Sequence, residues 1–74
     1  MDELIPFEQR LRQILWDRNI NTIQFSIDTG IARNIFYRNR HKHRRAIYMA
    51  IAYYLNMTVE ELVEGTTAMD EWYG

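Results

Sequence analysis

The chain of 74 residues contains no cysteine, a single proline and only three glycines. Without cysteine there can be no disulfide and no thiolate metal site, and nothing indicates an oxidising compartment. The longest purely apolar run, residues 46–55, is about half as long as the roughly 20 residues that a membrane-spanning helix needs. The opening residues MDELIPFE are acidic, whereas a secretory signal begins with basic residues. We therefore expect a cytoplasmic protein with no membrane segment.

Apolar residues make up 47% of the chain and charged residues 26%. This balance is typical of a globular protein, because enough apolar surface is present to offset the entropy that folding removes. A chain of this length forms one domain with a small core. We expect residues 1–64 to form that domain and residues 65–74 to be a short acidic and aromatic tail.

Charge is distributed unevenly along the chain. Residues 33–45 contain six of the nine Lys and Arg residues and no acidic residue, so the rest of the chain holds three basic and ten acidic residues. The net charge of −1 therefore conceals a segment of +6 within a remainder of −7. Such segregation predicts one basic face on an otherwise acidic protein, so the small net charge does not exclude nucleic-acid binding.

Apolar residues recur at helical spacing, as at Phe7, Leu11 and Leu15, and no alternating strand pattern competes with them. Asn21 and Thr58 are candidate N-caps, since each precedes a Gln or Glu by three residues. Glycines and Asn56 mark helix ends. These signals predict an all-α protein of five helices, at about residues 6–18, 22–29, 32 or 33 to 39 or 40, 44–55, and 58–64.

The second and third predicted helices flank Gly30, with Ser26 four residues before it, Ile31 directly after it and Phe36 six residues after it. The stretch NMTVEELV, residues 56–63, also looks like the "GVSLDELL" stretch that closes one family of small domains. In order and spacing, residues 7–63 resemble the lambda-repressor-like, Cro-like family of helix-turn-helix DNA-binding domains. The resemblance implies a five-helix fold with the helix-turn-helix at helices 2 and 3, as in small regulators of phages or mobile elements.

The resemblance also implies roles for the basic segment. The third helix would enter the major groove, where arginine can pair with guanine and asparagine with adenine. The base-contacting residues would be Arg33, Asn34, Tyr37 and Arg38. The phosphate-contacting residues would be Thr22, Arg40, Lys42, His43, Arg44 and Arg45.

Catalytic and metal chemistry have little support in this sequence. His41 and His43 are two residues apart, but no cysteine or neighbouring carboxylate completes a metal site. No nucleophile with its base and no phosphate-binding glycine loop is present. We therefore expect neither an enzyme nor a cofactor, and no small-molecule substrate.

The predicted helix at 44–55 is apolar for ten consecutive residues, so more than one of its faces must be covered. This pattern predicts a homodimer or a partner protein, with further apolar residues on the first two helices joining the contact. The candidate interface residues are Trp16, Ile23, Ile27, Tyr48, Tyr53 and Trp72.

Two hypotheses follow from these patterns. The first is a regulator that binds operator DNA, as a dimer, through its third helix. The second is a phage modulator or antirepressor that uses the same fold to bind a co-encoded repressor protein. The second is motivated by Thr22 and Ala32, which stand where the family often has a phosphate-binding Gln and a capping Ser, and by acidic residues suited to a basic partner. Those residues are Glu60, Glu61, Glu64, Asp70 and Glu71.

Overall fold

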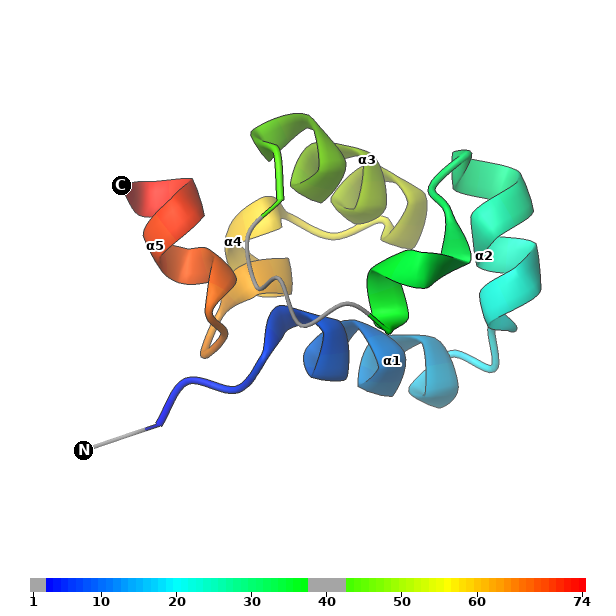
Figure 1. The fold of residues 1–74 in the computed structure, drawn as a ribbon, viewed down its shortest axis with the longest axis horizontal. Coiled ribbons are helices and arrows are strands. Elements are labelled where there is room, and N and C mark those ends of the chain that lie inside the picture. The colour runs from blue at the N-terminus through cyan, green and yellow to red at the C-terminus, as the bar shows by residue number, and fades with distance from the viewer. Residues whose placement is uncertain (1–2, 38–42) are drawn as a thin grey trace.

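The computed structural model describes residues 3–37 and 43–74, which form five α-helices and one 3₁₀ turn. In chain order the elements are α1 (Phe7–Asp17), α2 (Thr22–Thr29), the 3₁₀ turn η1 (Arg33–Phe36), α3 (Arg45–Leu55), α4 (Val59–Val63) and α5 (Ala68–Tyr73). Figure 1 shows α1 and α3 along opposite edges of the molecule, with α2 at one end and α5 at the other. The predicted all-α class is confirmed, and no helix of the described residues is long and apolar enough to cross a membrane.

One apolar face of each helix forms a single core. On α1, Phe7, Leu11 and Leu15 follow each other at intervals of four residues and are at most 1% exposed. Aromatic rings link the elements edge to face, with Phe25 of α2 standing 5.6 Å from Phe36 of η1. The buried apolar residues are Phe7, Leu11, Leu15, Phe25, Ile35, Phe36, Tyr48, Ile51, Ala52, Leu55, Leu62, Val63 and Ala68.

Arg10 of α1 and Arg18, the C-cap residue of α1, complete the ends of other helices. The guanidinium of Arg10 donates to the carbonyls of Leu62 and Glu61 at distances of 3.1 and 3.0 Å, and so occupies the end of α4. Arg18 donates to the carbonyl of Leu55, the last residue of α3. The last carbonyls of a helix lack partners within it and carry partial negative charge, so a cation there is favourable. These contacts fix α3 and α4 relative to α1.

The turn between α2 and η1 is built as the spacing predicts. Gly30 has a φ of 74°, a left-handed conformation that costs glycine little. Its N–H donates to the Ser26 carbonyl at 2.9 Å, and the Ser26 hydroxyl donates to the carbonyl of Ile31. A small residue at position 26 thus closes the turn through its hydroxyl.

The predicted caps are largely confirmed. Asn21 caps α2 by accepting the N–H of Ile23 at 2.7 Å, although Gln24 bonds to Asp28 instead of closing a capping box. Asn56 ends α3 with a left-handed φ of 56°. The capping box that begins α4 is complete and is described with the acidic face below.

Residues 65–74, expected as a tail, are folded against the rest of the domain. The N–H of Ile5 donates to the Gly65 carbonyl, and the Ile5 carbonyl accepts the N–H of Thr67, both at 3.0 Å. Thr66 and Ala68 are 0% exposed. The sequence did not predict α5 because this segment is short and polar and has no side-chain cap. The one residue of α5 that is fully buried is Ala68, whose small methyl group gives no apolar pattern.

Tyr48 was expected at a protein interface and this expectation is wrong. The residue lies on the same face of α3 as Ile51 and Leu55 and is 0% exposed. Its ring stands 5.0 Å from that of Phe7, and its hydroxyl accepts the backbone N–H of His43 at 3.0 Å. Burial raises the pKa of Tyr48, so the phenol stays protonated inside the core.

Candidate nucleic-acid interface

The element expected to read DNA is shorter than predicted. The described residues contain one 3₁₀ turn, Arg33–Phe36, and its C-cap residue Tyr37, in place of a longer α-helix that begins there. Ala32 offers no side chain to cap the turn, and Asn34 and Ile35 are weak helix formers. Ile35 was not predicted as a core residue, yet it is buried next to Phe36. Two adjacent buried side chains therefore anchor η1.

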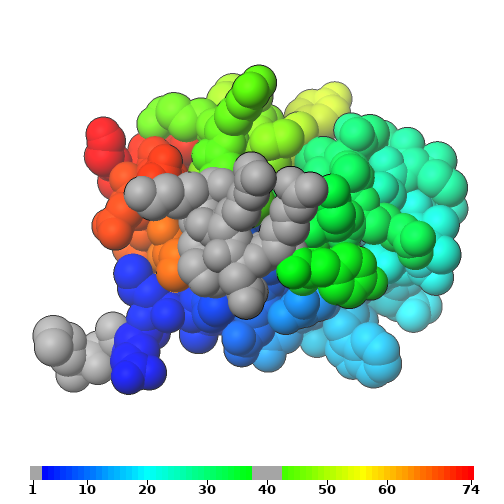
Figure 2. Space-filling view, in the orientation of Figure 1, coloured from blue at the N-terminus to red at the C-terminus, as the bar shows by residue number. Residues whose placement is uncertain are grey.

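The outward side chains of η1 are those expected to contact bases. Arg33 and Asn34 are exposed, and Tyr37 keeps 75% of its surface exposed. Arg33 makes no hydrogen bond or ion pair within the part of the chain that the structure describes. Figure 2 shows the surface of residues 31–37, in green, beside the blue surface of α1. The fourth expected base-contacting residue, Arg38, lies outside the described residues.

Arg12 of α1 holds η1 in place. Its guanidinium donates to the carbonyl of Phe36, the last residue of the turn, at 2.8 Å. The last carbonyls of a helical turn lack partners within the turn itself, and the arginine satisfies one of them. Arg12 was not predicted as a site residue, and nothing in its local spacing indicates a partner 24 positions away.

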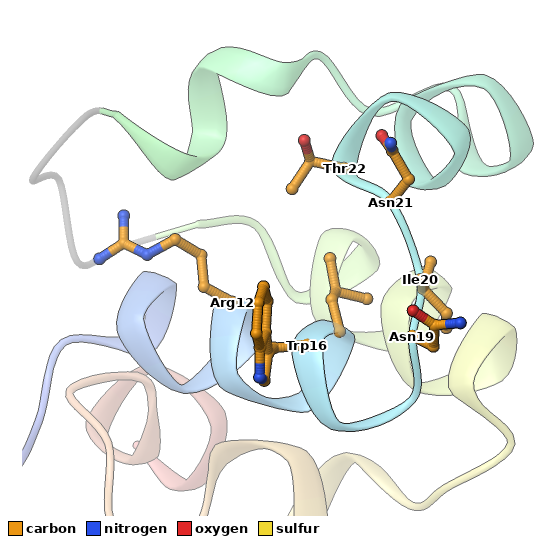
Figure 3. Close-up of a pocket in the computed structure, with 7 residues that line it drawn as sticks. Arg12, Trp16, Asn19, Ile20, Asn21 and Thr22 are labelled. Atoms are coloured by element: carbon orange, nitrogen blue, oxygen red, sulfur yellow. The ribbon is translucent and has the colours of Figure 1, made fainter.

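Next to Arg12, an open hollow of about 480 Å³ separates the end of α1 from the start of α2. Figure 3 shows Arg12 and Trp16 rising from α1 while Thr22 projects from the first turn of α2. Trp16 is 84% exposed and Thr22 is half-buried. The first N–H groups of a helix attract anions, and Asn21 occupies only one of those of α2. The hollow thus combines a helix N-terminus, a hydroxyl and an indole beside η1.

Of the residues expected to contact phosphate, some are exposed, some bind within the protein and some lie outside the described residues. Arg44, the N-cap residue of α3, is exposed and makes no hydrogen bond or ion pair with the described residues. Arg45 departs from its expected role, because its guanidinium donates to the carbonyl of Trp72 at 2.7 Å and stacks 4.1 Å from the centre of that indole. Arg40 and Lys42 lie outside the described residues.

His43 was expected to contact phosphate, and the structure places its ring elsewhere. The ring is tilted against Phe7, and its Nε2 lies 3.0 Å from Oε2 of Glu8, a carboxylate on the buried face of α1. The two side chains are 11% and 3% exposed. His43 therefore ties the end of the basic segment to α1. No group of three metal-ligating side chains occurs among the described residues, and His41 lies outside them.

The remaining interface candidates lie on four different helices, α1, α2, α3 and α5. Trp16 borders the hollow, Ile23 and Ile27 of α2 are 50% and 70% exposed, and Tyr53 of α3 is 90% exposed. Trp72 is half-buried and packs against the core, and its indole N–H donates to Glu60 at 2.6 Å. Trp72 thus connects α5 to α4 and to Arg45 and is not part of an open apolar surface.

The acidic residues gather on α4 and α5. Glu60, Glu61 and Glu64 line a second hollow, of about 380 Å³, with Met69 and Tyr73. Glu61 is also the third residue of the α4 capping box, in which its carboxylate accepts the backbone N–H and the hydroxyl of Thr58 at 3.2 and 3.0 Å. The backbone hydrogen bond and then the hydroxyl hold the pKa of Glu61 below its usual value, so this carboxylate keeps its charge.

A short helix, a left-handed glycine and a second element with outward Arg and Asn side chains define this protein as one of the helix-turn-helix class. The comparison with family models agrees with the geometry. Residues 10–67 match the model of the Cro/C1-type HTH DNA-binding domain, and the chain belongs to that family. No curated protein and no solved structure matches the chain.

Proposed function

We propose that this protein is a small transcriptional regulator of the phage or mobile-element kind that acts in the cytoplasm and binds an operator in the major groove through η1. The observation that chiefly supports the proposal is the state of Arg33 and Asn34, which are exposed on a turn fixed by Arg12 and Phe36. A rigid turn presents its donors at little entropic cost, and each good bidentate pair with a base contributes roughly 1–3 kcal/mol of discrimination. We assign no catalytic role to the chain.

Phosphate contacts would hold this turn in register. Thr22 at the start of α2 and Arg44 at the start of α3 are available for them, and Arg38, Arg40 and Lys42 of the basic segment would add charge. Such contacts release counterions, so the affinity should fall steeply as salt rises, with a slope of about −0.9 per phosphate neutralised. Trp16 would pack against the sugar and phosphate groups at the edge of the hollow.

The test is a gel shift with duplex DNA from the region upstream of the gene, repeated over a salt series and against a scrambled duplex. The double variant Arg33→Ala with Arg38→Ala should abolish the specific complex, a loss of about 2–6 kcal/mol for two bidentate pairs. The matched control Arg44→Gln should weaken specific and scrambled duplexes equally. If wild-type protein forms no salt-sensitive complex specific to the upstream duplex, operator binding is wrong.

A second candidate function is favoured by the acidic hollow on α4 and α5. A phage modulator or antirepressor would use Glu60, Glu61 and Glu64 against the basic DNA-reading surface of a co-encoded repressor, with Tyr73 as an apolar contact. Co-expression with that repressor and size-exclusion chromatography tests this function. Formation of a complex that Glu64→Lys weakens and Arg33→Ala leaves intact would support it, and separate elution of the two wild-type proteins would contradict it.

A further inference from the structure

Helix α3 has two apolar faces, and only one of them is covered. Tyr48, Ile51, Ala52 and Leu55 point into the core. On the opposite side of the helix, four apolar residues at positions i, i+3, i+4 and i+7 are all exposed, with Met49 at 55% and Tyr53 at 90%. We call these the α3 outer face: Ala46, Met49, Ala50 and Tyr53. No charged residue interrupts it.

The α3 outer face fits an inverted copy of itself. Its order is small, large, small, large, and the midpoint lies between Met49 and Ala50. In an antiparallel pair of α3 helices, Tyr53 faces the partner's Ala46 and Met49 faces the partner's Ala50. Large side chains opposite small ones allow two helices to approach closely and interdigitate. A two-fold axis through that midpoint generates this antiparallel arrangement.

Charge favours the same arrangement. The N-terminal end of α3 carries the exposed Arg44, which makes no hydrogen bond or ion pair with the described residues. Beside the C-terminal end lies an open hollow of about 580 Å³, lined by Tyr53, Met57 and the Glu61 carboxylate among others. An antiparallel pair brings each Arg44 toward Glu61 at the partner's hollow, whereas a parallel pair brings the two Arg44 side chains together. The helix dipoles also oppose each other in the antiparallel pair.

We propose that the α3 outer face is the interface of a homodimer in which two α3 helices pack antiparallel about an axis between Met49 and Ala50. The partner is a second copy of this chain. Figure 1 shows α3 along the edge opposite α1, so the contact leaves the hollow at α1 and α2 open. The dimer forms without DNA and does not depend on the proposed operator binding.

The cysteine-free sequence permits a direct test of the register by single cysteines. With a rise of 1.5 Å per residue, the two copies of residue 50 lie about 1.5 Å apart along the helix direction, and the two copies of residue 46 about 10 Å apart. A disulfide requires Cα atoms within about 7 Å. Mild oxidation should therefore cross-link Ala50→Cys to itself and leave Ala46→Cys or Tyr53→Cys without a disulfide when each is oxidised alone. A mixture of Ala46→Cys and Tyr53→Cys should form a disulfide between the two variants.

Sedimentation of the unmodified chain supplies the second measurement. The wild-type protein should sediment as a dimer, and Tyr53→Ser should raise the dissociation constant by about tenfold or more, since a large aromatic contact is lost on both sides. The matched control Tyr73→Ser, at a 61% exposed tyrosine of α5, should leave it within about twofold. Circular dichroism confirms that both variants fold.

The proposal is overturned by a wild-type protein that stays monomeric at high micromolar concentration. It is equally overturned if Tyr53→Ser leaves the dimer intact while Tyr73→Ser dissociates it, or if Ala46→Cys cross-links to itself as readily as Ala50→Cys. These measurements contain no DNA and no repressor, so failure of operator binding leaves them unaffected.

Discussion

The arginines of α1 and its C-cap, and those of the basic segment at residues 33–45, carry the same cationic group in opposite surroundings. Arg10, Arg12 and Arg18 each donate to a backbone carbonyl at the end of another element. Arg33 and Arg44 are exposed and have no hydrogen bond or ion pair with any described residue. The first group stabilises the fold, and the second remains available to a ligand. Arg10, Arg12 and Arg18 are the only Lys or Arg residues outside residues 33–45, and each of them thus binds a backbone carbonyl of the protein itself.

Two residues of the basic segment bind within the protein, as the arginines at α1 do. His43 and Arg45 belong to the basic segment by sequence, but His43 pairs with Glu8 and Arg45 with Trp72. Both are structural residues at the point where the segment rejoins the core. Substitutions at His43, Arg10 and Glu61 test this division.

The largest effect is expected at His43. In the variant His43→Ala, the buried Glu8 carboxylate loses its imidazole partner and Phe7 loses a ring contact, so unfolding should become easier by about 2–3 kcal/mol. Urea denaturation followed by circular dichroism measures this change. The neighbouring control Arg44→Ala should shift stability by less than about 0.5 kcal/mol, as expected for a surface substitution. Equal losses of stability in His43→Ala and Arg44→Ala would contradict a structural role for His43 and an exposed, unbound Arg44.

A smaller loss is expected from Arg10→Met, which keeps most of the aliphatic stem but removes two donors. The carbonyls of Leu62 and Glu61 would then depend on water, and the free energy of unfolding should fall by about 1–2 kcal/mol. The same urea experiment applies. DNA affinity, compared at equal fractions of folded protein, should be unchanged, and a reduced salt slope for this variant would place Arg10 in the binding surface instead.

The smallest effect concerns the acidic side and is a pH dependence. Because hydrogen bonds from Thr58 lower the pKa of Glu61 in the folded state, its contribution to stability is present above the ordinary carboxyl pKa and is lost as the pH falls through the lowered value. Wild type should therefore be more stable than Glu61→Gln at neutral pH, and the difference should vanish in acid. Parallel urea titrations at both pH values check this, and a difference that persists in acid would exclude the charge as its cause.

The sequence predicted most of the fold because its signals are local. Helical spacing in Phe7, Leu11 and Leu15 predicted α1, and Asn21, Gly30 and Thr58 marked real helix ends. The short η1 was missed because the pattern after Gly30 was extended as a helix to residue 39 or 40, whereas η1 begins without a side-chain cap and buries two adjacent side chains. The position of α5 depends on Ile5, which is far away in the sequence, so no local pattern could reveal it.

The candidate site was predictable to a smaller extent. Exposure of Arg33, Asn34 and Tyr37 followed from their place after the turn, since Ile31 and Phe36 had to face inward. The roles of Arg12 and Glu8 did not follow, because each depends on a partner more than 20 positions away. Tyr48 was misassigned for a related reason: in a helix that is apolar on all sides, composition does not tell which tyrosine is buried.

The arginine contacts of α1 have a consequence for cooperativity. Arg10 and Arg18 join residues 52 and 37 positions apart, so α1 cannot detach without releasing the ends of α4 and α3 together. We therefore expect the slowest backbone amides of the three helices to exchange with solvent through one common unfolding event. In this small domain, these arginine contacts are then what makes separate helices open as one cooperative unit.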